Sequence, residues 1–280
     1  MAKLLEGNPI AERIKEEIRD GVKSLKSKPV LASIMVGRNS AAETYLKAQK
    51  KTAESLGIEY QLHNLPGDIT EAALIDFVQK LNSDKSVKGI IIQMPLPQQI
   101  NCKKTSCCIL PVKDVEGIHP DNIGRLFFAK SSMIPCTAQA VMELLKESGV
   151  DLTGKEVVVV GHSEIVGKPL AILLLEKLAT VTVCHIGTAK AGKLEEHVRN
   201  AEILIVAVGK AGLIKGDWIK EGAIVIDVGI NRVGEQLVGD VEFLPAEKHA
   251  AFITPVPGGV GPLTVIMLMR NLLEAAKLQQ

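Results

Sequence analysis

The stretch that decides the fold is EVVVVGHSEIVGKP, residues 156–169. Val157–Val160 is an uninterrupted β-branched run of the kind that forms a buried parallel strand. Gly161 ends this run, and an apolar periodic stretch over residues 169–178 then predicts a helix. A strand, a glycine turn and a helix together present backbone N–H groups and a helix N-terminus to a phosphate. Ser163 stands at the second glycine of the usual dinucleotide fingerprint G-x-G-x-x-G, so a tight turn that binds nothing is the alternative interpretation.

Composition points to an α/β protein and gives no electrostatic signal for nucleic acid. The 280 residues suffice for one large domain or two ordinary ones. Hydrophobic residues make up 46% and aromatic residues only 3%, so we expect an aliphatic core. The 33 basic residues nearly balance 32 acidic ones, which leaves no charged footprint for nucleic acid or an anionic membrane. No apolar run reaches the roughly 20 residues that a membrane-spanning helix needs.

The cysteines indicate the compartment. Five of them, at positions 102, 107, 108, 136 and 184, include no C-x-x-C pair and leave an odd thiol. This pattern favours free thiols in a reducing cytosol over a disulfide framework or a zinc site. The N-terminal MAKLLEGNPI has no signal-peptide core. The sequence therefore predicts a cytoplasmic protein without a metal centre.

Strands and helices are expected to alternate along the chain. Asn8 and Pro9 predict a helix start, and Ser40–Glu43 matches a capping box. Strands are expected at 30–36, 58–65, 89–93, 156–160, 180–184, 202–207 and 223–228. Helices are expected at 8–26, from 40 onward, and at 68–81, 138–147, 169–178 and 263–278, with Thr137 as a cap. Such alternation is typical of parallel sheets covered by helices.

Two segments rich in proline or glycine interrupt this pattern. Residues 94–135 contain prolines at 95, 97, 111, 120 and 135. A loop of that length in a compact enzyme is usually functional or lies between domains. The second segment is TPVPGGVGP, residues 254–262. We expect two α/β lobes with a cleft where these loops meet.

Several segments together resemble one family, methylenetetrahydrofolate dehydrogenase/methenyltetrahydrofolate cyclohydrolase. They run in the family's order and cover nearly the whole chain. The matching stretches are Val36-Gly37 with Ser40 and Tyr45, IIQMPLP (91–97), PVKDVEGIHPDNIGRL (111–126), IPCT (134–137), GHSEIVGKPLAILL (161–174), ATVTVCH (179–185), AVGKAGLI (207–214), GAIVIDVGIN (222–231), GDVEF (239–243) and TPVPGGVGPLT (254–264).

The resemblance implies a two-domain enzyme. Residues 1–133 and 264–280 would form a folate-binding catalytic domain, to which the last helix returns. Residues 134–263 would form a Rossmann-like NAD(P)-binding domain. The implied reaction is oxidation of 5,10-methylenetetrahydrofolate by hydride transfer to NAD(P)⁺, followed by hydrolysis of the methenyl product to 10-formyltetrahydrofolate. The implied partners are tetrahydrofolate derivatives and a second copy of the chain in a homodimer.

The family's hydrolysis uses a Tyr-x-x-x-Lys pair on one helix face, and this chain departs from it. Here the segment reads Tyr45-Leu-Lys-Ala-Gln49. At about 100° per residue, positions i and i+4 share a face, so Gln49 stands where the family has its lysine, and Lys47 points elsewhere. A neutral amide can hydrogen-bond folate or water, but it cannot act as an ammonium or shuttle a proton near neutral pH. The resemblance therefore predicts the dehydrogenase step and leaves the cyclohydrolase step open.

A second departure lies in residues 113–117, Lys-Asp-Val-Glu-Gly. The family has aspartate where Glu116 stands and uses it to hold the pterin's amino group and ring nitrogen. Either the longer side chain shifts the pterin by about an ångström, a misplacement that can matter for rate, or the loop compensates for it. By motif position the catalytic residues are Tyr45, Gln49, Gln93 and Glu116, and the folate-binding set adds Ile92, Met94, Asp114, Pro257, Gly258, Gly259 and Gly261. The alternatives are a half-buried aromatic for Tyr45, a strand-end polar residue for Gln93, and a structural ion pair between Lys113 and Asp114.

Motif position also implies the cofactor site. Its residues would be Thr137, Gly161, His162, Ser163, Ile165, Ile186, Val208, Gly209, Ile230 and Thr264. Relatives commonly have arginine at His162 and a polar or basic residue at Ile186, where those groups contact the 2′-phosphate of NADP. No Asp or Glu follows the strand 181–184 to bind the ribose hydroxyls of NAD. His185, Lys190 and Lys193 lie nearby in sequence, and we expect NADP, with NAD as the alternative cofactor.

Two functional hypotheses follow. The first is an active dehydrogenase with weakened or absent cyclohydrolase activity. The second is a folate-binding or heteromeric subunit that has lost turnover, suggested by the departures at 49, 116, 162 and 186. The intact loops at 161–169 and 254–262 favour the first, because a non-catalytic binder has little reason to keep both.

Overall fold

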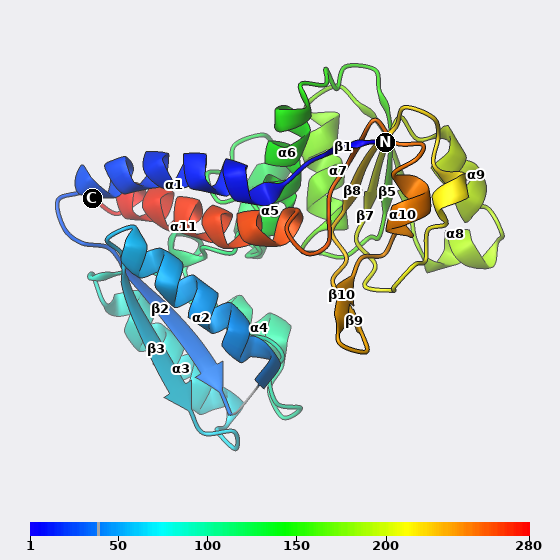
Figure 1. Ribbon diagram of the computed structural model, residues 1–280. Coiled ribbons are helices and arrows are strands. Elements are labelled where there is room, and N and C mark those ends of the chain that lie inside the picture. Colours follow the sequence, from blue (N-terminus) through cyan, green and yellow to red (C-terminus); the bar gives the residue numbers. More distant parts are fainter. Residues whose placement is uncertain (38–39) are drawn as a thin grey trace. The chain divides into compact units, whose positions relative to one another are not determined.

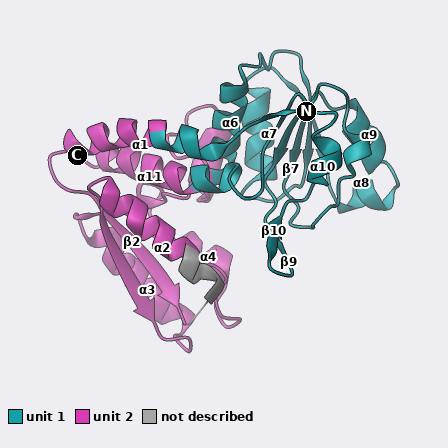
Figure 2. Cartoon of the chain, viewed as in Figure 1, with its two compact units in different colours: residues 1–12, 137–264 teal, residues 13–136, 265–280 magenta. Residues whose placement is uncertain are grey.

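The computed structural model describes residues 1–37 and 40–280, including all of these side chains except those of 40–44 (Figure 1). The expected capping box at Ser40–Glu43 lies outside the described side chains. The chain divides into two compact units (Figure 2). Unit 1 comprises Met1–Glu12 and Thr137–Thr264, and unit 2 comprises Arg13–Cys136 and Val265–Gln280.

Unit 1 is built on a six-stranded parallel sheet. Its strand order is β1-β11-β8-β7-β5-β6. The strands are β1 (Lys3–Leu4), β5 (Glu156–Val160), β6 (Thr180–Cys184), β7 (Ile203–Val206), β8 (Ile224–Asp227) and β11 (Phe252–Ile253). The direction in which strands are added to the sheet reverses at β5: β6, the next strand in the chain, pairs with β5 on one side, and β7 pairs with it on the other. In open parallel sheets such a switch point places a crevice at the carboxyl ends of the strands.

Both faces of this sheet are covered. Val157–Val160 is buried throughout, and Val158 and Val160 pack with Leu194 and Val198 on one face. The helices of unit 1 are α6 (Cys136–Ser148, whose first residue falls in unit 2), α7 (Gly167–Leu175), α8 (Ile186–Lys190), α9 (Leu194–Asn200) and α10 (Phe243–Ala246), with the short turn η2 (Gly216–Trp218). An antiparallel hairpin, β9 (Asn231–Val233) and β10 (Gln236–Val238), extends from the unit.

Unit 2 contains a three-stranded parallel sheet in the order β3-β2-β4. The strands are β2 (Val30–Val36), β3 (Glu59–Leu65) and β4 (Val87–Ile92), and β2 is buried at all seven positions. The helices are α2 (Ser40–Ser55), α3 (Glu71–Ser83), α4 (Cys102–Ser106) and α5 (Pro120–Phe127), with the turn η1 (Pro111–Lys113). Two further helices, α1 (Gly7–Lys23) and α11 (Val260–Leu278), contribute residues to both units.

The two faces of β2 have different partners, and this places the site. Ala32, Ile34 and Val36 pack with Leu74 and Val78 of α3. Successive side chains of a strand point to opposite faces, so Leu31, Ser33 and Met35 point the other way. Met35 there contacts Leu46 of α2. Helix α2, which carries Tyr45 and Gln49, therefore packs on this second face of the sheet.

The expected division of the chain differs from the observed units at the N-terminus. The sequence assigned 1–133 to one domain, whereas Met1–Glu12 groups with unit 1 because β1 pairs in parallel with β11. Elements of two or three residues, such as β1, β11 and the β9–β10 hairpin, were absent from the predicted pattern. The segment expected to be an irregular loop contains α4 and α5. Helix α6 begins at Cys136, so Thr137, expected as its cap, lies inside the helix.

No helix in the described part of the chain is long and apolar enough to cross a membrane.

Candidate active site

Four polar side chains converge on the α2 side of the unit 2 sheet. Gln49 Oε1 accepts hydrogen bonds from Tyr60 Oη at 3.0 Å and from Gln93 Nε2 at 3.0 Å. Gln93 Nε2 also donates to Ser33 Oγ at 3.0 Å. Gln49 and Gln93 are buried, with exposed fractions of 0% and 6%. The strand register explains the convergence, because Ser33 pairs with Ile91, two residues before Gln93, and Tyr60 pairs with Leu31 on the same face as Ser33.

Tyr45 lies one turn before Gln49 on α2 and has an exposed fraction of 37%. Burial of the phenol raises the pKa of Tyr45 well above its usual range, and the nearby Cys136 and Glu116 add to the rise, while the Gln49 amide opposes it. Gln49 Oε1 is held by Tyr60 and Gln93, whereas its buried Nε2 atom has no hydrogen-bond partner in the structure.

The loop after η1 holds two carboxyl groups with different roles. Asp114 is 3% exposed, and its carboxylate accepts from His119 N at 2.7 Å, Asn122 Nδ2 at 2.9 Å and Gly117 N at 3.2 Å. These bonds occupy it within the loop. Glu116 is half-buried, and burial raises the pKa of its carboxyl to about 8, with a further rise from the charge of Asp114. Glu116 is thus the carboxyl group available to a ligand.

Lys113 anchors the same loop to α3. Its Nζ donates to the carbonyl oxygens of Leu81 at 2.9 Å, Asn82 at 2.8 Å and Asp84 at 2.6 Å. These are carbonyls at the C-terminus of α3, which no helical N–H can reach. The alternative of an ion pair between Lys113 and Asp114 is wrong, because each side chain turns to its own partners.

Helix α11 also holds the loop that carries Glu116. Asn271 Nδ2 donates to Val115 O at 2.8 Å and to Ile134 O at 2.9 Å, and Cys136 Sγ donates to Val115 O at 3.4 Å. Burial raises the pKa of the Cys136 thiol well above its usual range, so the thiol stays protonated. These contacts hold the backbone immediately before Glu116.

The two remaining predicted folate residues of unit 2 flank Gln93. Ile92 is 1% exposed and belongs to the core, so its side chain does not face the site, whereas Met94 is 43% exposed. Sequence reasoning missed Ser33, Tyr60 and Asn271. Tyr60 is one of only two tyrosines in the chain, and Asn271 is a polar residue within an otherwise apolar stretch of helix. Both signals were available, but neither indicated a role.

Unit 1 gathers the predicted cofactor residues at the carboxyl edge of its sheet. Ile165, Ile186, Val208 and Ile230 follow β5, β6, β7 and β8 in turn. Their exposed fractions are 54%, 68%, 45% and 60%. Four large apolar side chains left in solvent along one sheet edge offer a surface for the flat rings of a dinucleotide. This observation fits the NAD(P) cofactor that the glycine loop indicates.

The turn after β5 depends on glycine. Gly161 has a φ of +124°, and a Cβ there would lie 2.3 Å from Ala207 O. A Cβ on Gly167, at the start of α7, would lie 2.0 Å from Gly161 O. Ser163 Oγ accepts from Val166 N at 3.1 Å and so shapes the turn from within. Glycine is thus required at these two positions, while Ser163 replaces the middle glycine of the fingerprint without disturbing the turn.

Two histidines meet at the ends of β5 and β6. The rings of His162 and His185 lie edge to face, with centroids 5.2 Å apart. His185 Nδ1 accepts from Gly187 N at 3.1 Å, and Thr188 Oγ1 accepts from His185 N at 3.2 Å, which forms a capping box for α8. Because Nδ1 is an acceptor, the neutral His185 ring carries its proton on Nε2. Both rings are thus available where the sequence predicts the 2′-phosphate of NADP.

Two aspartates hold the loop after β7, and sequence reasoning assigned them no role. Asp240 accepts from Val208 N at 2.7 Å, Gly209 N at 2.9 Å and Lys210 N at 2.8 Å. Asp227 in turn accepts from Asp240 N at 3.0 Å, and burial raises its pKa to about 6. The predicted cofactor residues Val208 and Gly209 are thereby fixed in place. Their amides are already used by Asp240, so their contribution to a ligand comes from the exposed Val208 side chain.

The other predicted residues of unit 1 lie around the loop between β11 and α11. Gly258 has a φ of +110°, and its carbonyl accepts from Gly7 N at 2.8 Å. A Cβ on Gly7 would lie 1.9 Å from Gly259 O, so the backbone segments around Gly7 and Gly259 are in close contact. Pro257, Gly259 and Gly261 share this loop or the first turn of α11, Thr264 follows in α11, and Thr137 lies in α6. In the described residues no group of His, Cys, Asp and Glu could hold a metal ion.

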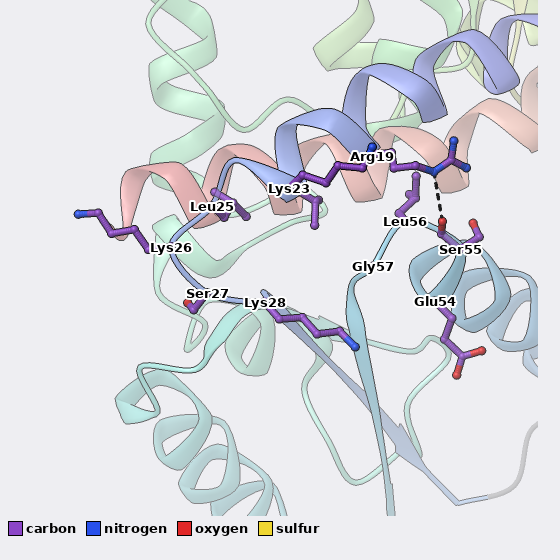
Figure 3. A pocket seen from close by; sticks show the side chains of 11 residues that line it. Arg19, Lys23, Leu25, Lys26, Ser27, Lys28, Glu54, Ser55, Leu56 and Gly57 are labelled. Atoms are coloured by element: carbon purple, nitrogen blue, oxygen red, sulfur yellow. Dashed lines mark hydrogen bonds between the residues drawn. The ribbon is translucent and has the colours of Figure 1, made fainter.

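A separate hollow lies at the C-terminal ends of α1 and α2 (Figure 3). It encloses about 650 Å³ and is lined by Arg19, Lys23, Lys26 and Lys28, with Glu54 opposite. Arg19 Nε donates across it to Ser55 O at 3.5 Å. None of the predicted site residues lines this hollow, so it is distinct from the polar cluster around Gln49.

Comparison with known proteins agrees with this geometry. Residues 5–116 match the family model described as tetrahydrofolate dehydrogenase/cyclohydrolase, catalytic domain, and residues 135–280 match that family's NAD(P)-binding domain. Bifunctional protein FolD 2 of Geobacter metallireducens is 51% identical over 99% of this chain and 98% of its own length. The structure of bifunctional FolD from Campylobacter jejuni superimposes with a TM-score of 0.96 at 43% identity, covering 100% of both chains.

A second solved relative bears on the cofactor. The methylenetetrahydrofolate dehydrogenase-cyclohydrolase of Trypanosoma brucei, described as complexed with NADP cofactor and inhibitor, superimposes with a TM-score of 0.93 at 40% identity. That match covers 99% of this chain and 97% of the relative. Both sequence and structure thus agree over essentially the full length. The chain belongs to the tetrahydrofolate dehydrogenase/cyclohydrolase family.

Proposed function

We propose that this chain is an NADP-dependent 5,10-methylenetetrahydrofolate dehydrogenase whose cyclohydrolase activity is weak or absent. The observation that carries the proposal is the buried Gln49, held by Tyr60 and Gln93 at the position of the family's lysine. The side chains hydrogen-bonded around it, Ser33, Tyr60 and Gln93, are all uncharged. Hydride transfer does not need a cation there, whereas hydrolysis needs a group that activates water.

Each unit contributes its own residues to the proposed reaction. NADP, when bound, supplies the nicotinamide that accepts the hydride. In unit 1, the turn at Gly161 and Ser163 would hold the pyrophosphate of NADP. The exposed apolar side chains at the sheet edge would contact its rings. His162 and His185 would contact its 2′-phosphate. In unit 2, Glu116 would accept hydrogen bonds from the pterin, and Tyr45, Gln49 and Gln93 would orient the methylene bridge. Positioning of two reactants in this way is the main contribution that a protein makes to hydride transfer.

The decisive assay measures both half-reactions on the purified protein. With 5,10-methylenetetrahydrofolate and NADP, nicotinamide absorbance should rise with turnover. With 5,10-methenyltetrahydrofolate alone, disappearance of its absorbance should barely exceed the rate in buffer. Bound folate without reduction of either NADP or NAD would instead support the non-catalytic folate-binding subunit.

The proposal extends to assembly and location. We propose a homodimer, as the family resemblance implies, and a location in the cytoplasm, as the cysteine pattern indicates. The five cysteines are all free thiols in the structure, which suits a reducing compartment. Light scattering of the purified chain at several concentrations measures the mass directly. A monomer at every concentration would contradict the dimer without affecting the proposed reaction.

A further inference from the structure

The four polar side chains of unit 2 form one hydrogen-bonded cluster. Gln93 Nε2 donates to both Ser33 Oγ and Gln49 Oε1, which uses both of its hydrogens. Tyr60 Oη also donates to Gln49 Oε1. Burial raises the pKa of Tyr60, and the nearby Ser33 hydroxyl opposes this rise. Gln49 Oε1 is thus held by two donors.

The Gln49 amide turns its oxygen toward this cluster. Its Oε1 receives two donors, from Tyr60 and Gln93. If the Gln49 amide alone were flipped, its NH₂ group would lie against the NH₂ group of Gln93, and two donors would lose their acceptor.

The consequence is an unused donor in a buried position. Gln49 is 0% exposed, and its Nε2 has no hydrogen-bond partner in the structure. A buried unpaired donor is costly, and such groups are usually completed by a ligand or a water. Tyr45, one turn before Gln49 on the same helix, is partly exposed.

We propose that Tyr60, with Ser33, is a positioning residue that locks the Gln49 amide so that Nε2 donates to a carbonyl-type acceptor on the bound folate. The inference rests on the proposed function and names the contact that Gln49 makes there. A neutral N–H can donate to a neutral oxygen or nitrogen acceptor without bringing a charge into the site, whereas an ammonium in the same place would favour water or an anion. Gln49 thus acts in substrate binding, and Tyr60 acts through it without touching the substrate.

The first test removes the hydroxyl that sets the orientation. Tyr60→Phe should weaken binding of tetrahydrofolate, measured by calorimetry, by about threefold to tenfold, as expected for one neutral hydrogen bond that is no longer held in place. Binding of NADP should stay within twofold. Ser33→Ala removes the hydroxyl that accepts from Gln93, the second donor to Gln49, and should shift tetrahydrofolate binding in the same direction. If either variant folds and binds tetrahydrofolate like the unmodified protein, the proposal is wrong.

The second test keeps the shape and exchanges the donor. In Gln49→Glu the carboxylate still accepts from Tyr60 and Gln93 but has no hydrogen to donate. Tetrahydrofolate affinity should fall about tenfold or more at pH 8 and recover towards pH 5.5, where the buried carboxyl binds a proton and regains a donor. Taking the ratio to the unmodified protein at each pH cancels the titration of the facing groups Tyr45, Tyr60, Glu116 and Cys136.

A control and a reference separate this inference from the proposed function. Gln236→Glu makes the same replacement on the exposed β10 strand of unit 1 and should leave the affinity unchanged at every pH. A loss in Gln49→Glu that does not recover at low pH would mean that Gln49 supports only the fold, and the donor role would fail. If the unmodified protein neither binds tetrahydrofolate nor reduces NADP, the proposed function itself fails.

Discussion

At the scale of single residues, Gln49 separates the two half-reactions. Gln49→Lys would place an ammonium beside Tyr45, Tyr60 and Gln93, where burial lowers the pKa of a lysine towards neutrality. Such a group can exchange a proton with water. We expect hydrolysis of methenyltetrahydrofolate to rise at least about 100-fold, the lower end of what a positioned acid or base contributes. The measurement is the loss of methenyl absorbance without NADP.

The matched control for this substitution is Lys47, which lies on the exposed side of α2. Lys47→Gln should leave methenyl hydrolysis unchanged, since its exposed side chain lies away from the polar cluster around Gln49. An unchanged rate in Gln49→Lys would mean that a different group limits hydrolysis in this chain.

Glu116 makes substrate capture depend on pH. Burial raises the pKa of its carboxyl to about 8 in the free protein. A carboxylate accepts hydrogen bonds from pterin N–H groups, whereas a protonated carboxyl accepts them poorly. Below about pH 8 Glu116 is protonated, so kcat/KM for methylenetetrahydrofolate should rise as pH increases through this value.

The test compares pH profiles of kcat/KM, which report groups of the free enzyme. Glu116→Gln should lower kcat/KM at pH 9 and remove the inflection near pH 8. Glu116→Asp should keep an inflection, because it restores the family's carboxyl group. A profile that is unaltered in Glu116→Gln would assign the inflection to another residue.

At the scale of elements, the C-terminus of α3 depends on a distant lysine. The three carbonyls that Lys113 Nζ binds would lose their partner in Lys113→Met, and Lys113 is only 4% exposed. Buried polar groups without partners cost about 1–3 kcal/mol each. Because a backbone carbonyl near a helix end can find water, we expect a total loss of about 2–4 kcal/mol in unfolding free energy, measured with urea.

Lys80→Met serves as the control, since Lys80 is an exposed residue of the same helix. It should change the unfolding free energy by less than about 0.5 kcal/mol. Lys113→Met should also raise KM for the folate, because η1 leads into the loop of Glu116. Equal stability of the two variants would remove Lys113 from the support of the site.

The elements that the sequence predicted and those that it did not differ in how they are stabilised. β2, β5 and the helices α1 and α3 bury long apolar patterns, and such periodicity is visible in a single sequence. β1 and β11 consist of two residues each and exist only because distant segments pair. Helix α5 is signalled by Pro120 at its first turn, but its cap is His119, whose Nδ1 accepts from Asp121 N at 3.1 Å. Histidine is not among the preferred capping residues.

The candidate site shows the same limit. Tyr45, Gln49, Gln93 and Glu116 were predicted because they fall in recognisable motifs, and the structure places all four in unit 2. Ser33 and Tyr60 were not predicted, because their role depends on strand register, which brings β2, β3 and β4 together on the α2 side. Pairing register is a tertiary property and leaves no local signal.

At the scale of the whole molecule, the two units are expected to unfold together, and NADP should stabilise both. Helices α1 and α11 contribute residues to each unit, so loss of one unit removes turns from helices of the other. Trp218, the only tryptophan, packs against the unit 1 core and reports on that unit. NADP at 100 times its Kd should add about 2.7 kcal/mol to the unfolding free energy. The tryptophan transition and the circular dichroism of all helices should shift by the same amount.

Independent units would give a different result. NADP would then move only the tryptophan transition, and the circular dichroism would split into two steps, of which the unit 2 step would stay in place. NAD provides the control for cofactor choice: if His162 and His185 bind the 2′-phosphate, NAD at the same concentration should shift the transition less than NADP does. In His162→Gln the shifts caused by NADP and by NAD should become more alike, because one of the two rings proposed to contact the 2′-phosphate is gone.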